Sequence, residues 1–298
     1  MKINFIANRK IGYIFSTLLI VASVVSLSFW GLNLGIDFTG GSLLEVAFIN
    51  ERPTNDQLHQ TLEPFNLGGV VIQPTGEQDV IFRFRDVSED EHQSILSLLR
   101  ENHGDIQSKR FESIGPTLGA ELGKRALWVI GFALIFIILY IAWAFRKVAK
   151  PVASWKYGLS AIAALAHDVL ITVGIFSVLG HYLNVEVDSL FVSAILTVLG
   201  FSVHDTIVVF DRTRENLFRG IIGSFDQVVN KSINDTLTRS INTSLTTLLV
   251  LAALFFYGGS TIHYFALALI VGIAIGTYSS IFIASPLLVE WYKLTDRH

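Results

Sequence analysis

The sequence has 298 residues, of which 51% are hydrophobic and only 16% are charged, and its mean hydropathy is +0.54. Soluble domains carry about a quarter charged residues, so this deficit needs a cause. The absence of cysteine excludes a disulfide framework, a thiol nucleophile and a cysteine-ligated metal site. The net charge of −3 matters less than its distribution, because the charges cluster and leave long uncharged runs between them.

Six of these runs are long enough to cross a bilayer, which takes about 20 predominantly apolar residues in a helix. We therefore expect an all-α membrane bundle of six transmembrane helices. The first run follows Lys2, Arg9 and Lys10, as the core of a signal peptide would, but it is too long and no cleavage site follows it. It is better interpreted as an uncleaved anchor. The predicted spans are 11–30, 126–145, 157–180, 190–210, 240–257 and 264–288.

Lysine and arginine fall in every second connection between these spans. The loops at 181–189 and 258–263 contain neither residue. Cytoplasmic loops carry the excess of basic residues, so we expect both termini, including the tail 289–298, on the cytoplasmic side of the membrane. The basic residues of the other connections are Lys2, Arg9, Lys10, Arg146, Lys147, Lys150, Lys156, Arg212, Arg214, Arg219, Lys231, Arg239, Lys293 and Arg297.

The segment 31–125, between the first two spans, is polar and has the size of a small domain. It holds 8 lysine and arginine residues against 15 aspartate and glutamate residues, a net charge of −7. Long loops are translocated largely regardless of charge, so these basic residues do not disturb the predicted topology. We expect a periplasmic head domain here.

Strand and helix patterns alternate within this segment. Helical runs follow two capping boxes, Thr54 with Gln57 and Ser88 with Glu91. Alternating apolar residues mark the strands: Leu44, Val46 and Phe48, then Val80, Phe82 and Phe84, with shorter candidates at 69–73 and 109–114. The order βαββαβ predicts a small α+β ferredoxin-like domain. Its scattered histidines form no catalytic constellation, so we expect a binding or docking module.

Three ionisable residues stand inside or at the edge of predicted spans, where a charge costs about 2.5–3.5 kcal/mol even on lenient scales. Asp168, after His167, is central in the third span, Asp205, after His204, lies in the fourth, and Arg239 opens the fifth. Asp168 could equally be a structural hydrogen-bonded carboxylate. Arg239 could equally extend to the membrane surface.

Asp205 is harder to explain as a structural group, because an apolar stretch more than one helical turn long follows it. Burial favours the protonated carboxyl and a nearby cation favours the ionised one, so a movable Arg239 would make Asp205 bind and release a proton. His204 and His167 could join a relay, although a single intramembrane histidine is also common as a packing residue. No further ligands appear at usable spacing, so we expect no metal and no cofactor.

Two helical patterns concern packing. Gly272 and Gly276 form a G-x-x-x-G in the sixth span, which favours close helix contact. A four-residue apolar repeat predicts an amphipathic helix at about 217–238 on the cytoplasmic membrane surface, with Ser224 and Gln227 as a capping box. A helix that merely covers the bundle fits the same pattern. The repeat consists of Leu217, Ile221, Phe225, Val229, Ile233 and Leu237.

Longer motifs are more specific. They are Gly35-Ile36-Asp37-Phe38-Thr39-Gly40-Gly41 after the first span, Glu112-Ser113-Ile114-Gly115-Pro116 with Gly119, Glu121 and Leu122 before the second, Gly200-Phe201-Ser202-Val203-His204-Asp205-Thr206-Ile207-Val208-Val209-Phe210-Asp211-Arg212 in the fourth, and 232–243 and 276–284 around the last two. In this order, and over nearly the whole chain, they resemble the SecD/SecF family of the resistance-nodulation-division superfamily.

This resemblance implies one six-helix half of a pseudo-symmetric transporter, partnered by SecD and working beside the SecYEG channel, with YajC and YidC as further candidate partners. The implied role is to pull unfolded preproteins outward late in translocation, driven by a proton or sodium gradient. In the family, the aspartate and arginine that match Asp205 and Arg239 are the coupling pair. SecF members more often have asparagine where His204 stands, which leaves the coupling ion open. The glycine signature would form a turn between membrane and head.

Two other classes of function compete with ion-driven export. A passive assembly factor of the translocon or an insertase would use the buried charges only structurally. A half-transporter for small solutes would need a large pocketed periplasmic domain, and the segment 31–125 is too small for one. No nucleophile, base and orienting group assemble, so we expect no enzyme, and we expect no nucleic-acid partner.

Overall fold

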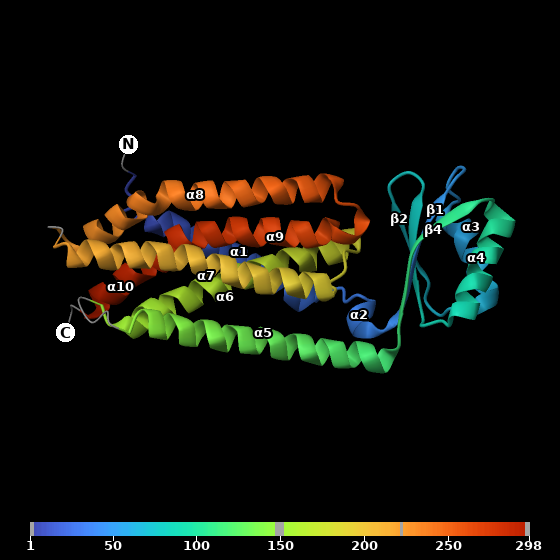
Figure 1. The fold of residues 1–298 in the computed structure, drawn as a ribbon, viewed down its shortest axis with the longest axis horizontal. Coiled ribbons are helices and arrows are strands. Elements are labelled where there is room, and N and C mark those ends of the chain that lie inside the picture. Colours follow the sequence, from blue (N-terminus) through green and yellow to red (C-terminus); the bar gives the residue numbers. More distant parts are fainter. Residues whose placement is uncertain (1–2, 147–151, 221–222, 296–298) are drawn as a thin grey trace. The chain divides into compact units, whose positions relative to one another are not determined.

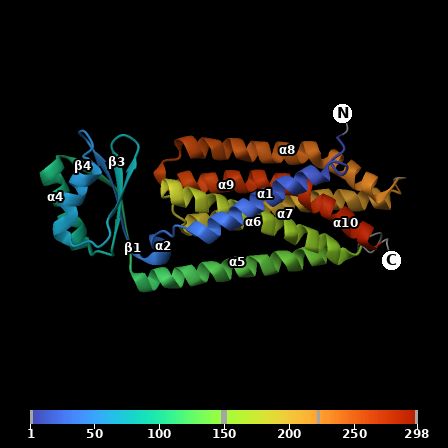
Figure 2. The same ribbon diagram turned by 180° about the vertical axis from the view of Figure 1, so that it is seen from behind.

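The computed structural model describes residues 3–146, 152–220 and 223–295, and the chain divides into two compact units. The helical unit comprises residues 1–33 and 129–298, and the α/β unit comprises residues 34–128. Figures 1 and 2 show the helices and strands from two opposite sides. The two units are described separately below.

The α/β unit contains one antiparallel sheet with the strand order β2-β3-β1-β4. Its strands are β1 (Gly41–Phe48), β2 (Val71–Thr75), β3 (Asp79–Phe84) and β4 (Ile106–Ile114). The helix α3 (Asn55–Leu62) connects β1 to β2, and α4 (Glu89–His103) connects β3 to β4. This is the βαββαβ arrangement of a ferredoxin-like domain, and it confirms the predicted fold.

The alternating apolar residues of this unit form its core. Leu44, Val46, Val80 and Phe82 are fully buried, because successive side chains of a strand point to opposite faces and only one face meets the helices. Both predicted capping boxes are present, at Thr54 before α3 and at Ser88 before α4. The α/β unit therefore has a hydrophobic core of its own.

The helical unit confirms the predicted bundle, with six helices long and apolar enough to cross a membrane. They are α1 (Arg9–Trp30), α5 (Pro116–Ala144), α6 (Ser154–Leu183), α7 (Ser189–Phe218), α8 (Phe225–Tyr257), and the last helical stretch of α9 (Ser260–Ser279), a π-helical turn (Ser280–Ala284) and α10 (Ser285–Thr295). Helices α6, α7 and α9 pack against one another, while α1 packs on α6 and α8 packs on α7 and α9. The interior of the unit therefore lies between α6, α7 and α9.

The predicted amphipathic surface helix at 217–238 is wrong as a separate element. Helix α7 continues to Phe218, and α8 begins at Phe225 after the Ser224 capping box and runs unbroken to Tyr257. No glycine or proline interrupts α8, so nothing in its sequence ends the helix at the expected boundary. Five members of the apolar repeat instead pack into the bundle, where Phe225, Val229 and Ile233 belong to the hydrophobic core and Leu217 and Leu237 pack against it. The sixth, Ile221, lies outside the described residues.

One end of the helical unit gathers many of the basic residues. Arg9 at the start of α1 contacts Glu290 of α10 at 2.5 Å, and Lys293 of α10 contacts Asp226 at the start of α8 at 2.6 Å. The backbone of Ile3 is held by hydrogen bonds with the side chains of Asn230 and Asn234 of α8. These contacts tie the beginning of α1, the beginning of α8 and α10 together.

Candidate functional site

Asp205 lies inside the helical unit although it is ionisable. Its side chain projects from α7, the residue is 3% exposed, and Oδ2 has no hydrogen-bond partner among the described residues. The hydroxyl groups of Ser240 on α8 and Thr277 on α9 lie near the carboxyl, and His204 and Arg239 lie within electrostatic reach of it. An oxygen that is buried without a donor is costly, so this is a place where an additional cation or proton would be stabilised.

Arg239 lies on the neighbouring helix, well inside α8 rather than at its beginning. Its side chain is exposed on the outside of the isolated chain. It acts electrostatically on Asp205, but the structure shows no ion pair between these two described residues. The structure thus brings the predicted pair to adjacent helices without joining it, and α8 begins earlier than expected without burying the guanidinium.

His204 faces the outside of the unit. It is exposed, whereas its neighbour Asp205 is buried, because consecutive residues of a helix point about 100° apart. Its imidazole still lies within electrostatic reach of the Asp205 carboxyl. A relay role of His204 stays a prediction.

Hydroxyl groups complete the surroundings of Asp205, and sequence reasoning did not assign them this role. Thr277 contacts Ser244 at 2.5 Å between the two side-chain oxygens, which joins α9 to α8. Ser240 Oγ is buried and, like Asp205 Oδ2, has no hydrogen-bond partner by geometry among the described residues. Ser240 and Ser244 are one helical turn apart, so both hydroxyls lie on the same side of α8, but this spacing alone does not mark either as a neighbour of Asp205.

Asp168 is fully buried and belongs to a different cluster. His167 Nδ1 lies 2.8 Å from Asp168 Oδ1, and the hydroxyls of Ser202 and Ser279 donate to Oδ2 over 2.5 and 2.8 Å. Both carboxyl oxygens therefore have partners, contributed by α6, α7 and α9. Ser202 lies one helical turn before Asp205, so the two clusters share α7.

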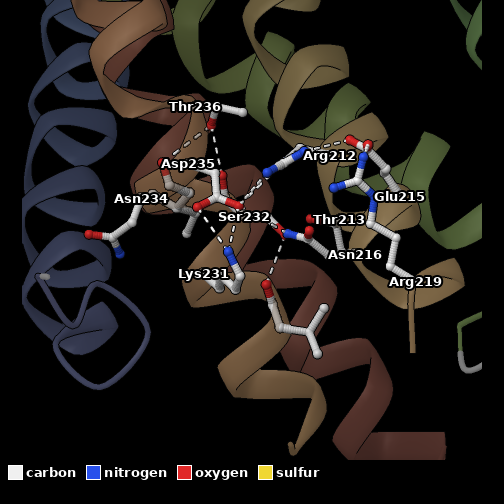
Figure 3. Close-up of polar contacts among 12 residues, drawn as sticks. Arg212, Thr213, Glu215, Asn216, Arg219, Lys231, Ser232, Asn234, Asp235 and Thr236 are labelled. Carbon is white, nitrogen blue, oxygen red and sulfur yellow. Dashed lines mark hydrogen bonds and ion pairs between the residues drawn. The ribbon is translucent and has the colours of Figure 1, made fainter. Parts of the chain in front are cut away.

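A network of charged residues links α7 to α8 (Figure 3). Arg212 of α7 donates from Nε and Nη2 to Asp235 Oδ2 of α8 over 3.0 and 2.8 Å. Lys231 donates to the same carboxyl oxygen over 2.9 Å, and Arg212 also donates to Glu215 over 2.7 Å. Asp235 precedes Arg239 by one helical turn, so this network holds the segment of α8 that carries the arginine.

The two glycine signatures meet within the α/β unit. Gly40 has φ of +75°, and a Cβ placed there would lie 2.6 Å from the Cα atom of Pro116. A Cβ on Gly119 would in turn lie 2.7 Å from the Gly40 backbone nitrogen. A side chain does not fit at either position. Gly40 combines a positive φ with the close approach, whereas at Gly119, which lies in α5, the close approach alone requires glycine. Gly35, Asp37, Phe38 and Gly41 flank this contact on one side and Gly115 on the other.

The predicted close contact of the sixth span is also present. A Cβ on Gly272 would overlap Val198 of α7, and one on Gly276 would lie 3.0 Å from Ser202 Cβ. Among the described residues there is no group of three histidine, cysteine, aspartate or glutamate side chains that could hold a metal ion.

Comparison with known protein families gives two matches. Residues 94–294 match the family "Protein export membrane protein SecD/SecF, C-terminal", and residues 25–48 match the "SecD/SecF GG Motif". Together these matches include the first glycine signature, Asp168, Asp205 and Arg239.

Individual relatives give the same result. The chain is 43% identical to a protein translocase subunit SecF of Thermobaculum terrenum, over 97% of this chain and 94% of that protein. It is 42% identical to a protein translocase subunit SecF of Haemophilus influenzae, over 94% of this chain and 83% of that protein. The crystal structure of SecDF from Thermus thermophilus, a translocon-associated membrane protein, matches with a TM-score of 0.85 and 34% identity. This match covers 98% of the chain but only 39% of the longer SecDF chain.

Proposed function

The chain belongs to the SecD/SecF family of protein-export membrane proteins, on its SecF side, and we propose that it is a subunit of the bacterial protein-export machinery that couples ion flow to preprotein translocation. It uses the proton or sodium motive force, together with SecD, to promote the late stage of export across the inner membrane. The observation that carries this proposal is the buried Asp205 oxygen, which has no partner among the described residues and lies within electrostatic reach of Arg239 on the neighbouring helix.

The coupling follows from the cost of an unpaired charge in a low-dielectric interior. Asp205 lowers this cost either by binding a proton or sodium ion, or by meeting the guanidinium of Arg239. If α8 moves so that Arg239 approaches Asp205, the ion bound to Asp205 is released. When Arg239 withdraws, Asp205 binds an ion again. Ion passage and movement of α8 against α7 are therefore linked.

The protein matches only 39% of the SecDF chain, so the proposed partners begin with a protein that corresponds to the rest of SecDF. We propose that SecD supplies the second six-helix half and covers the outer face that exposes His204 and Arg239, because exposed charges in a membrane need a polar partner. SecYEG, with YajC and YidC, and an unfolded preprotein complete the proposed assembly. The ferredoxin-like unit is the proposed contact for protein partners.

The orientation is likewise a proposal. Arg9, Lys231 and Lys293 lie at the end of the helical unit where α1 begins, and Arg212 pairs with α8 near the same end. The positive-inside rule assigns this end to the cytoplasm and the α/β unit to the periplasm.

The substitution Asp205→Asn tests the proposal, because asparagine keeps the size of the side chain but cannot titrate. Export of a preprotein into inverted membrane vesicles is measured with and without an ion gradient, with Asp211→Asn, an exposed carboxylate of the same helix, as the matched control. We expect Asp205→Asn to lose the gradient-dependent part of export and Asp211→Asn to keep it. Undiminished gradient-dependent export with Asp205→Asn would favour the passive assembly factor instead.

A further inference from the structure

We propose that His167 and Asp168 form a second proton-binding site, in which the two side chains together hold one proton inside the helical unit. This site extends the proposed function, on which its role in export rests. The protonation itself rests on the geometry of the pair. Both residues are buried, with side chains 3% and 0% exposed.

The pair is the start of a chain of polar contacts that runs from α6 to α1 and α9. His167 Nδ1 lies 2.8 Å from Asp168 Oδ1, and His167 Nε2 lies 3.0 Å from Ser16 Oγ of α1. Ser16 Oγ lies 3.1 Å from the hydroxyl of Tyr278, which donates to the carbonyl oxygen of Gly12 over 2.9 Å. The four contacts form one series. It begins at the Asp168 carboxyl oxygen and ends at the Gly12 carbonyl oxygen, and each of these oxygens accepts a hydrogen bond.

Counting protons assigns the state of the pair. Four contacts need four protons, of which Ser16 and Tyr278 supply one each. A neutral imidazole beside an ionised carboxylate supplies only one more, so one contact would have no hydrogen. An imidazolium beside a carboxylate supplies two, and so does a neutral imidazole beside a carboxylic acid. In both of these forms the pair carries one additional proton and is neutral overall.

The surroundings of the pair favour this neutral form. Among the described residues, the side chains that hydrogen-bond with it are Ser16 of α1, Ser202 of α7 and Ser279 of α9, and the Tyr278 ring of α9 lies beside that of His167. Of these four residues only Tyr278 is titratable. The carboxyl of Asp205 lies one helical turn from Ser202. Without its proton the pair would place a second negative charge in the same bundle, which burial and like-charge repulsion both oppose.

Charged and titratable side chains of the packed helices lie further along each chain. These are Arg9, Lys10 and Tyr13 of α1, Lys156, Tyr157, His181 and Tyr182 of α6, His204, Asp205, Asp211, Arg212, Arg214 and Glu215 of α7, His263 and Tyr264 of α9, and Glu290, Tyr292 and Lys293 of α10.

Release of this proton would have a structural consequence. The contact between His167 and Ser16, or the next one in series, would lose its hydrogen, and with it a polar link between α6 and α1. Helix α1 leads in the chain directly into the signature that begins the α/β unit. The pair is thus placed to make the attachment of α1 depend on protonation, while Ser202 connects it to the helix that carries Asp205.

Spectroscopy of the full chain in lipid bilayers at pH 7 tests the proposal. With ¹⁵N-labelled histidine, His167 is assigned by its loss in His167→Gln, and infrared spectra detect a protonated carboxyl that disappears in Asp168→Asn. We expect either the imidazolium signal of His167 or the carboxylic-acid signal of Asp168. A neutral imidazole together with an ionised Asp168 would overturn the proposal.

Two variants distinguish between two explanations of an imidazolium signal: a proton shared by His167 and Asp168, and a His167 that is charged independently of Asp168. In Asp168→Asn we expect His167 to become neutral at pH 7, and an imidazolium that survives this change would contradict the pair. Ser26→Ala, on the same helix as Ser16 but hydrogen-bonded elsewhere, should leave the spectra unchanged. No gradient or translocon is used, so the result stands whether or not Asp205→Asn affects export.

Discussion

Gly272 lies where α9 and α7 are too close together for a side chain. A Cβ added there would overlap Val198, which is fully buried and has a stiff branched side chain. The contact holds α9 against α7, the two helices that carry Thr277 and Asp205. The space at this residue is therefore part of the geometry of the candidate site.

We predict that Gly272→Ala destabilises the protein by about 1–3 kcal/mol, since the added methyl group overpacks the helix interface. Gly131→Ala is the matched control, because nothing lies within 4 Å of a Cβ at this glycine of α5. The control should be neutral or stabilising by about 0.5–1 kcal/mol, through helix propensity. Thermal unfolding in detergent measures both, and equal melting temperatures for the two variants would refute the prediction.

For single residues of the candidate site, the sequence identified the buried carboxyl groups better than the hydroxyl groups around them. Asp205 and Asp168 stand out because a carboxylate in an apolar run is costly wherever the helix goes. Ser240 and Thr277 do not stand out, since a hydroxyl in a membrane helix costs little and often bonds its own backbone. Which hydroxyl meets which carboxyl depends on how α7, α8 and α9 pack, and no local pattern contains that information.

Helix α8 differs more from its prediction than the other helices and strands, because it is one continuous helix from Phe225 to Tyr257 and not a surface helix followed by a membrane span. It also carries Arg239. The four-residue apolar repeat was found correctly, but periodicity does not reveal whether an apolar stripe faces lipid or protein. The stripe faces the bundle. On the polar side of the same segment, the Asp235 carboxylate pairs both with Lys231 and with Arg212 of α7. The early part of α8 is therefore fixed on α7 from both sides.

We predict that Asp235→Asn loosens the part of α8 between Phe225 and Arg239. The change removes the charge that binds Arg212 and Lys231, and each exposed pair of this kind is worth about 0.2–1 kcal/mol. Backbone hydrogen exchange of this segment, measured by mass spectrometry, should rise by roughly up to fivefold, while α9 stays unchanged. Asp211→Asn, which removes an ion pair within α7 alone, is the control. Equal exchange in α8 of both variants would show that the network does not hold the helix.

For the whole molecule, the division into two units is what the sequence predicted most completely. The apolar runs mark the membrane helices by length alone, and strand alternation with two capping boxes marks the ferredoxin-like unit. The meeting of the two glycine signatures was not predicted, because Gly40 and Gly119 are far apart in the chain and only the folded sheet brings them together. Each unit has its own core, so each should respond to conditions in its own way.

The α/β unit should lose stability as the pH falls, because the pKa values of His103 and Glu91 are both lowered in the folded unit. Burial lowers the pKa of His103, whose ring packs against Phe48 and contacts the hydroxyl of Thr61 at 2.8 Å. The unfolded chain then binds this proton more readily, so stability is lost as the pH falls through about 6.5, the ordinary pKa of histidine. The hydrogen bond from Arg85 lowers the pKa of Glu91, which adds a second loss below about pH 4.3, the ordinary pKa of glutamate.

Hydrogen exchange of residues 41–114 in the full chain, corrected for the intrinsic effect of pH, should therefore show faster opening at pH 5.5 than at pH 7.5. His103→Gln keeps a side-chain donor that can reach Thr61 but cannot titrate, so the difference between the two pH values should become smaller. The Glu91 contribution is fully retained in this range, because both values lie above the ordinary pKa of glutamate. An unchanged pH dependence in His103→Gln would mean that some other group of the unit, and not this histidine, senses the fall in pH.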